Sequence, residues 1–510
     1  MSRPTLGVLG PAALSALLAG AYLLASPPST DLAAATFRAE LFEREGFVLW
    51  SSAWYSGHHL LGYSVIYPPL AALVGVRVAG VLAVVAAAGL FAALARRRFE
   101  DRALLASIWF SVGVASWLLT GRMAFLVGVA FGLAALLAAD ARRHVLVALC
   151  ATLTSLASPV AGLFLGLGGA AAGVAGDRRG GALLALPSLG TIAALNLAFP
   201  TDGTQPFPFS TFVAVPLLVA GTLCLVPREH HALRIGVLLY GLLCLVAFAI
   251  PTPVGSNAAR LGALFAGPVA ALVLLRRPLA LALACTPLLY WQLNGPLEDV
   301  IKGVGDPATE RAYFEPLLAE LDRVVPAAEP VRIHVPATEN RWEAAYVAPE
   351  YPLARGWLRQ LESEDVELFT AGNLTADAYR AWLDDRGVSY VALADAELDY
   401  LAADEADLIE GGLEFLQPLW RGEHWQLFAV ARPAGLVSGG GRVEDVGVDS
   451  FELSARAPGV YPLRVRHTGL WSVVEGSACV REAGGSTEVL VREPGTVRVQ
   501  AKLTGDACSG

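Results

Sequence analysis

The division of the chain near Asn294 constrains the fold more than any other feature of the sequence. Before this residue, long apolar runs alternate with short polar loops, and after it the composition becomes that of a soluble domain. Of the 510 residues, 55% are hydrophobic and only 16% are charged, which is too apolar for a soluble protein of this size. We therefore expect a membrane domain over residues 1–294, followed by soluble domains.

Apolar runs near the length that crosses about 30 Å of hydrocarbon mark the candidate membrane helices. Eleven such runs cover residues 6–26, 68–95, 103–120, 123–139, 144–157, 159–175, 181–198, 209–226, 234–250, 259–275 and 279–293. The fifth and sixth runs could instead form one bent helix. The expected fold class is thus a polytopic α-helical membrane bundle.

Arginine-rich loops decide between these two possibilities. They lie at residues 96–102, 140–144, 177–181, 227–234 and 276–278. If two helices meet at Ser158-Pro159, all of these loops share one side of the membrane, and the positive-inside rule makes that side cytoplasmic. A single bent helix would turn the later loops outward. We predict eleven spans, a cytoplasmic N-terminus and extracytoplasmic C-terminal domains, with the first run kept as an anchor rather than cleaved as a signal peptide.

Two soluble domains follow the last span. Residues 295–432 alternate short apolar strands with helical stretches such as LTADAYRAWLDDRG, in which Thr375 is a candidate N-cap and Gly387 a candidate C-cap, and this predicts an α/β domain. Residues 433–510 contain segments of period two without a helix signal, which indicate a small β-sandwich. Cys479 and Cys508 are the only cysteines in these domains, and we predict that they form a disulfide.

Charge excludes several function classes. The net charge of −9 offers no basic surface for nucleic acid. The predicted spans contain no Asp, Glu or Lys, so they lack the ionisable relay that a proton-coupled transporter needs near the middle of the membrane. Arginine is abundant whereas lysine occurs only at Lys302 and Lys502, which is typical of a GC-rich bacterial genome. We expect the protein in a bacterial plasma membrane, in contact with membrane lipids.

Polar residues gather instead at the predicted outer ends of the spans. Asp31 follows the first span and could act as a general base, while Arg122 and Arg260 could bind the phosphate of a lipid-linked donor. Asn257 lies in the same loop as Arg260, within PTPVGSNAAR. These residues predict a site at the outer membrane surface.

The stretch WYSGHHLLGYSVIYPPL, which leads into the second span, adds further candidates. His58, His59 and Tyr63 could face a sugar or a phosphate, and Tyr67-Pro68-Pro69 would start the next helix. Structural explanations exist for all of these positions. Asp31 could simply cap a helix, Arg122 and Arg260 could anchor helix ends at lipid headgroups, and the two histidines could be ordinary interfacial residues.

Several segments together resemble a family of bacterial multi-spanning proteins of the GT-C glycosyltransferase type, whose members are often named only as membrane or major-facilitator-like proteins. These segments are TDLAAATFRAELF, WYSGHHLLGYSVIYPPLAALVG, GRMAFLVGVAFGLAAL, SPVAGLFL, FPFS, VGSNAARLGALFAGP, YPLARGWLRQL and LTADAYRAWLDDRGVSYVAL. The resemblance implies a GT-C-like helical bundle with a large first exterior loop, an essential acid at Asp31 and a polyprenyl-phosphate-linked sugar as donor.

The sequence departs from that family at the acid. Many GT-C enzymes carry two adjacent acids there, whereas this chain has Thr30-Asp31 and then only Glu40 and Glu43. No cofactor is therefore certain, although a divalent metal remains possible. The function that we predict is transfer of a sugar to a cell-envelope glycan, lipid or protein on the outer face. The alternatives are a lipid or solute permease or flippase, and a non-catalytic envelope scaffold.

Overall fold

The computed structural model of the chain describes residues 3–200, 203–326, 329–363, 365–370, 372–505 and 508, with only the backbone described for residues 3–7 and 101. The chain divides into two compact units. We call Met1–Ala39 with Leu61–Val304 the helical unit, and Glu40–Leu60 with Gly305–Gly510 the mixed unit.

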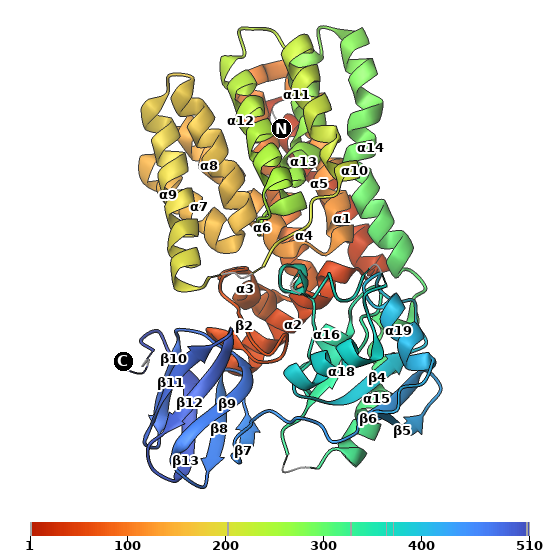
Figure 1. Cartoon of the computed structure of the whole chain (residues 1–510). Helices are drawn as coiled ribbons and strands as arrows, with labels where there is room; N and C mark the ends of the chain where they lie inside the picture. Colours follow the sequence, from red (N-terminus) through yellow and green to blue (C-terminus); the bar gives the residue numbers. More distant parts are fainter. Residues whose placement is uncertain are drawn as a thin grey trace. The chain divides into compact units, whose positions relative to one another are not determined.

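The helical unit is built from apolar helices joined by short loops (Figure 1). The α-helices are α1 (Arg3–Ala25), α2 (Thr30–Glu45, whose last six residues belong to the mixed unit), α3 (Tyr67–Val74), α4 (Val76–Phe99), α5 (Ala103–Ser116), α6 (Met123–Asp140), α7 (His144–Ala157), α8 (Pro159–Val174), α9 (Arg178–Ala198), α10 (Phe209–Phe212), α11 (Ala214–Leu225), α12 (His231–Ala249), α13 (Arg260–Leu274) and α14 (Pro278–Gly303). Short 3₁₀ helices are η1 (Glu100–Arg102), η2 (Trp117–Thr120) and η3 (Gly255–Ala259).

Length and composition mark this unit as membrane-spanning. Among the described residues, seven helices are long and apolar enough to cross a membrane, and three shorter apolar helices cover His144–Ala157, Pro159–Val174 and Phe209–Leu225. The chain is thus a multi-pass membrane protein, while the number of eleven spans stays a prediction. The second predicted span differs in detail: α3 starts at Tyr67 with prolines in its first turn, as expected, but Gly75 at φ 94° separates it from α4.

The predicted break between the fifth and sixth spans is confirmed. Helix α7 ends at Ala157 and α8 begins at Pro159, while Ser158 between them is extended, with φ −156° and ψ 115°. The Ser158 hydroxyl accepts a hydrogen bond from the amide of Ala161 and so caps α8. In Figure 1, α7, α8 and α9 stand side by side as one group of helices.

The arginine-rich loops are connected to one another at the ends of these helices. Arg98 donates to Asp140 at 2.9 Å and thereby links the end of α4 to the end of α6. Arg179 contacts His144 at 3.4 Å, and Arg277 donates to the carbonyl oxygen of Leu225 at 3.0 Å. Residues that the predicted topology places on the cytoplasmic side therefore contact one another at the helix ends. The sidedness itself stays a prediction.

The mixed unit begins with an α/β domain. Its four-stranded sheet has the order β3 (Arg332–His334), β4 (Val388–Ala394), β6 (Trp425–Val430) and β5 (Leu416–Arg421), with β3 and β4 parallel and the other pairs antiparallel. Its helices are η4 (Pro307–Thr309), α15 (Arg311–Val324), α16 (Glu343–Tyr346), α17 (Arg359–Glu362), α18 (Ala376–Asp385) and α19 (Ala403–Glu410). Thr375 caps α18 by accepting from the amide of Ala378, as predicted, and Gly387 follows that helix at φ 64°.

A small β-sandwich completes this unit. One sheet has the order β10 (Trp471–Glu475), β13 (Gly495–Ala501), β8 (Ser450–Ala455) and β7 (Arg442–Val446), and the other has β11 (Ala478–Ala483), β12 (Ser486–Val491) and β9 (Gly459–Arg466). Alternate residues of these strands are buried, as in β8, because one face of each sheet lies in the core. The predicted disulfide between Cys479 and Cys508 is present.

A third part of the mixed unit comes from far away in the sequence. The segment after α2 forms a short pairing of β1 (Trp50–Ser51) with β2 (His58–His59). The Trp54 indole donates to the carbonyl oxygen of Ala344 in the α/β domain at 3.1 Å, and the amide of Ser52 donates to Val448 beside the β-sandwich at 2.8 Å. The sequence placed this segment in the 1–294 domain, whereas the structure packs it with residues 305–510.

Candidate functional site

Asp31 lies in the first turn of α2, where the positive end of the helix dipole favours an acid. Its Oδ2 atom is 2.5 Å from Nε of Arg122, and the two form an ion pair. The side chain of Asp31 is 14% exposed and that of Arg122 is 30% exposed, so the pair can be reached from outside the protein. An acid that acted only as a helix cap would not need this ion pair.

A glycine turn brings Arg122 against the start of α2. Helix η2 ends at Gly121, which has a left-handed φ of 74°. A Cβ atom at this position would lie 2.4 Å from the amide nitrogen of Leu32 and 2.5 Å from Oγ of Ser29. Because only glycine fits this conformation and this close approach, Gly121 fixes Arg122 beside Asp31.

Arg38 and Tyr63 extend this charged region. Arg38 lies two turns after Asp31 on α2, is 3% exposed, and places its guanidinium 3.9 Å from the centre of the Tyr63 ring. Burial lowers the pKa of Arg38, and this is partly offset by Tyr63 and Asp31. Burial raises the pKa of Tyr63, whereas Arg38, Arg122 and Arg260 lower it. These groups therefore act on one another electrostatically.

Arg260 is the first residue of α13 and directly follows η3. Its guanidinium lies 5.5 Å from the centre of the Phe125 ring, and it is close enough to Tyr63 to lower the pKa of that phenol. Asn257 lies in η3, three residues earlier, and is half-buried. The structure thus brings Asp31, Tyr63, Arg122 and Arg260 into one electrostatic cluster and places Asn257 one turn from it.

Asp299 is a second carboxylate near this group, and the sequence analysis missed it. It lies near the end of α14, six residues past the last predicted span. Its pKa is raised to about 7, chiefly by burial; Arg122 opposes this rise and Asp31 adds to it. Burial lowers the pKa of Arg122, but Asp31 and Asp299 both raise it. The pKa of Arg122 therefore lies above its ordinary value.

We define the Asp31 cluster as Asp31, Arg38, Tyr63, Arg122, Arg260 and Asp299. Its arginines outnumber its carboxylates, so the cluster suits an anion better than a cation. Within the described residues, no group of three or more His, Cys, Asp or Glu side chains could hold a metal ion. No step of the chemistry is assigned to a metal ion.

The two predicted histidines lie in the mixed unit, and their role in the site stays a prediction. His58 is buried and its ring stacks on Trp54, with ring centres 5.1 Å apart and an angle of 7°. His59 meets the edge of Trp50, and its Nε2 atom is 3.0 Å from Oγ1 of Thr468. These contacts hold β2 against the mixed unit.

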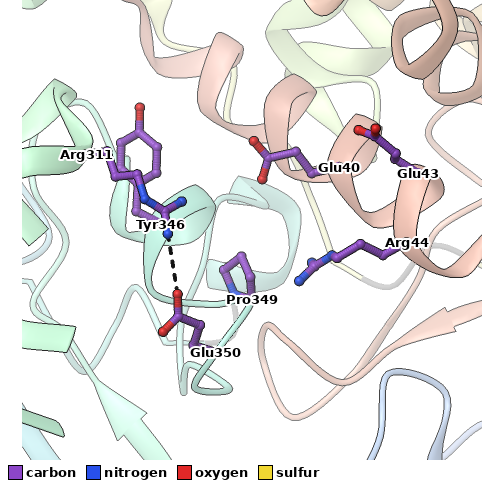
Figure 2. A pocket seen from close by; sticks show the side chains of 7 residues that line it. All are labelled: Glu40, Glu43, Arg44, Arg311, Tyr346, Pro349 and Glu350. Carbon is purple, nitrogen blue, oxygen red and sulfur yellow. Dashed lines mark ion pairs between the residues drawn. The ribbon is translucent and has the colours of Figure 1, made fainter. Parts of the chain in front are cut away.

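The mixed unit contains a pocket of about 370 Å³. One wall is the end of α2, which contributes Glu40, Glu43 and Arg44. The facing wall is formed by Arg311, Tyr346, Pro349 and Glu350. Figure 2 shows Glu40 and Arg44 extending from α2 towards that wall, where Arg311 pairs with Glu350 at 3.5 Å.

Comparison with known proteins leaves the family open. No protein-family model matches the sequence, and no curated protein matches it. Among solved structures, the chain is similar to ArnT from Cupriavidus metallidurans in the apo state, at 12% sequence identity and a TM-score of 0.39, over 79% of this chain and 93% of that chain. Similarity at this level carries no argument about fold or activity.

Proposed function

We propose that this protein is a membrane glycosyltransferase of the GT-C type, which moves a sugar from a polyprenyl-phosphate donor to a cell-envelope acceptor on the outer face of the membrane. The observation that carries the proposal is the ion pair of Asp31 with Arg122 inside a cluster that has an excess of arginine. An acid held beside several guanidinium groups combines a candidate base with a phosphate-binding surface.

Each residue has a role in this proposal. Arg122 contacts Asp31 through Nε, and we assign its terminal amino groups and the guanidinium of Arg260 to the donor phosphate. Oδ1 of Asp31 takes the proton of the acceptor hydroxyl as that oxygen attacks the sugar carbon and the lipid phosphate leaves. Arg38 is buried against Tyr63, and we assign it to positioning α2 rather than to contact with the donor.

The experiment is a transfer assay with the full chain in membranes and a panel of polyprenyl-phosphate sugars. Asp31→Asn keeps the size of the side chain but cannot take a proton, so turnover should fall by a factor on the order of 10² or more, with expression unchanged. The matched control is Asp177→Asn, because Asp177 also lies at a helix N-terminus, where it caps α9. Asparagine caps nearly as well as aspartate, so this control should transfer sugar normally.

Two results would contradict the proposal. If Asp31→Asn transferred sugar at the rate of the unchanged protein, Asp31 would not be the base. If no sugar were transferred from any donor while the protein moved lipids across the bilayer, the flippase alternative would replace the enzyme.

A further inference from the structure

The pocket of the mixed unit has a lining that the proposed chemistry at Asp31 does not use. Glu40, Glu43 and Arg44 are spaced so that all three share one face of α2. Burial raises the pKa of Glu40, and this is opposed by Arg44 and by Arg311 across the pocket. The carboxylate of Glu40 therefore lies within the field of guanidinium groups on both walls.

The lining indicates what kind of ligand would fit. With Glu350, the pocket has three carboxylates and two guanidinium groups, which is a formal charge of 2 − 3 = −1. This balance disfavours a phosphate or an acidic sugar. Carboxylates accept hydrogen bonds and guanidinium groups donate them, whereas each hydroxyl of a neutral sugar can do both. The Tyr346 ring and Pro349 add an apolar surface between these groups.

The size of the pocket limits the ligand further. Its volume of about 370 Å³ is near the lower end of the range of roughly 300–1,000 Å³ that is usual for small-molecule sites. The pocket therefore has room for one or two sugar rings and not for a lipid chain.

We propose that this pocket is an acceptor subsite that binds a neutral saccharide, so that the acceptor of the transferase is a glycan. This inference rests on the proposed function, which it deepens by naming the acceptor class.

Binding can be measured without any transfer reaction. The full chain is placed in lipid nanodiscs, because many detergents carry sugar headgroups that would compete. Saturation-transfer NMR is then recorded with a panel of neutral, amino and acidic disaccharides. We expect neutral disaccharides to bind, and Arg44→Ala and Glu40→Gln each to weaken that binding at least fivefold. Tryptophan fluorescence on heating verifies that both variants are folded.

Matched controls separate the pocket from general charge effects. Arg442→Ala removes an exposed arginine of β7 outside the pocket and should leave sugar binding unchanged. Absence of binding for the whole panel, preference for acidic disaccharides, or equal binding by folded Arg44→Ala would overturn the inference.

The experiments distinguish failure of the acceptor subsite from failure of the proposed function. If transfer depends on Asp31 but the pocket binds no sugar, the subsite is wrong and the transferase stands. If the pocket binds neutral sugars but the protein transfers none, the saccharide site stands as a binding site, while its role as an acceptor subsite is lost together with the proposed function.

Discussion

Two groups of charged side chains, one in each unit, differ in burial and in charge balance. The buried ion network of the α/β domain, which we define as His334, Arg341, Arg355, Glu362, Asp399 and Glu405, is 0–3% exposed. Arg341 lies 2.5 Å from Glu362 and 3.0 Å from Asp399, and His334 lies 2.5 Å from Glu405. Every carboxylate of the network thus has a basic partner within it.

The Asp31 cluster differs in both respects. Its central pair is partly exposed, and its three arginines exceed its carboxylates, one of which has a pKa of about 7. Removing one partner of a buried ion pair leaves an uncompensated buried charge, so loss of the buried ion network should unfold the domain that contains it. A partly exposed cluster with excess positive charge still attracts an anion, so its loss should affect binding first. Position within the fold therefore gives similar residues different roles.

The largest expected effect is on the buried ion network. In Arg341→Ala, the buried carboxylates of Glu362 and Asp399 would each lose a positively charged partner. Removing one partner of a buried ion pair costs about 3–5 kcal/mol. We expect the free energy of unfolding of the mixed unit to fall by that amount in chemical denaturation followed by tryptophan fluorescence. Arg359→Ala is the control, because Arg359 is 29% exposed and should matter less. Equal losses for the two variants would refute the distinction.

Removing the disulfide tests whether a loss of stability in the mixed unit leaves donor binding unchanged. Cys479→Ser opens a loop of 29 residues, which should lower the free energy of unfolding of the mixed unit by about 3–4 kcal/mol on the chain-entropy view. Sugar transfer and donor binding should not change, because neither cysteine belongs to the Asp31 cluster. A loss of donor binding in protein that is still folded would contradict the separation of the two regions.

A smaller effect is expected from the arginines of the Asp31 cluster. Arg260→Ala removes a charge-assisted hydrogen bond to the donor phosphate, which should weaken donor binding by about tenfold or more, with little change in stability. Arg96→Ala provides the control, since it removes the same charge from the last turn of α4. Isothermal titration with a polyprenyl-phosphate sugar in nanodiscs measures both. Equal weakening by the two variants would indicate a general effect of charge.

The smallest predicted effect is a dependence on pH. Because the folded protein raises the pKa of Asp299 to about 7, this carboxyl is neutral below that pH and becomes charged above it. The new negative charge opposes the donor phosphate, so donor binding should weaken a few-fold as pH rises through about 7. The donor is a phosphodiester, whose own charge is constant in this range. Asp299→Asn should remove the dependence, and a persistent dependence in that variant would exclude Asp299 as its source.

The same residue also affects stability. An acid with a raised pKa in the folded state releases its proton first in the unfolded chain, so its contribution to the free energy of unfolding decreases as pH rises from about 4 to about 7. This dependence should likewise be absent in Asp299→Asn. Stability against pH and donor binding against pH are therefore two independent measurements of one group.

Local signals in the sequence were sufficient for several features. Ser158-Pro159 is read correctly because proline starts a helix well and serine caps it, and Thr375 is identified for the same reason. The pairing of Cys479 with Cys508 follows because no other cysteine lies in the predicted soluble domains. In each case the prediction needs only a few neighbouring residues, or the number of cysteines in the predicted soluble domains.

Other features depend on contacts that are distant in the sequence. Arg38 could have been found, because it lies seven residues after Asp31 and therefore on the same face of a helix. No local pattern, however, brings Asp299 near Asp31, or pairs Trp54 with Ala344 within the mixed unit. Those placements follow from tertiary packing, which a single sequence does not specify by periodicity or spacing alone.

The most direct test of the central claim is mass spectrometry of the lipids that remain bound to the protein after purification. If the Asp31 cluster binds a lipid phosphate, the unchanged protein should retain a polyprenyl phosphate or its sugar ester. The double variant Arg122→Ala with Arg260→Ala should lose it, while Arg341→Lys, which keeps the charge of the buried ion network, should retain it. If no polyprenyl phosphate is found with the unchanged protein, or if the double variant retains as much as the unchanged protein, the account is contradicted.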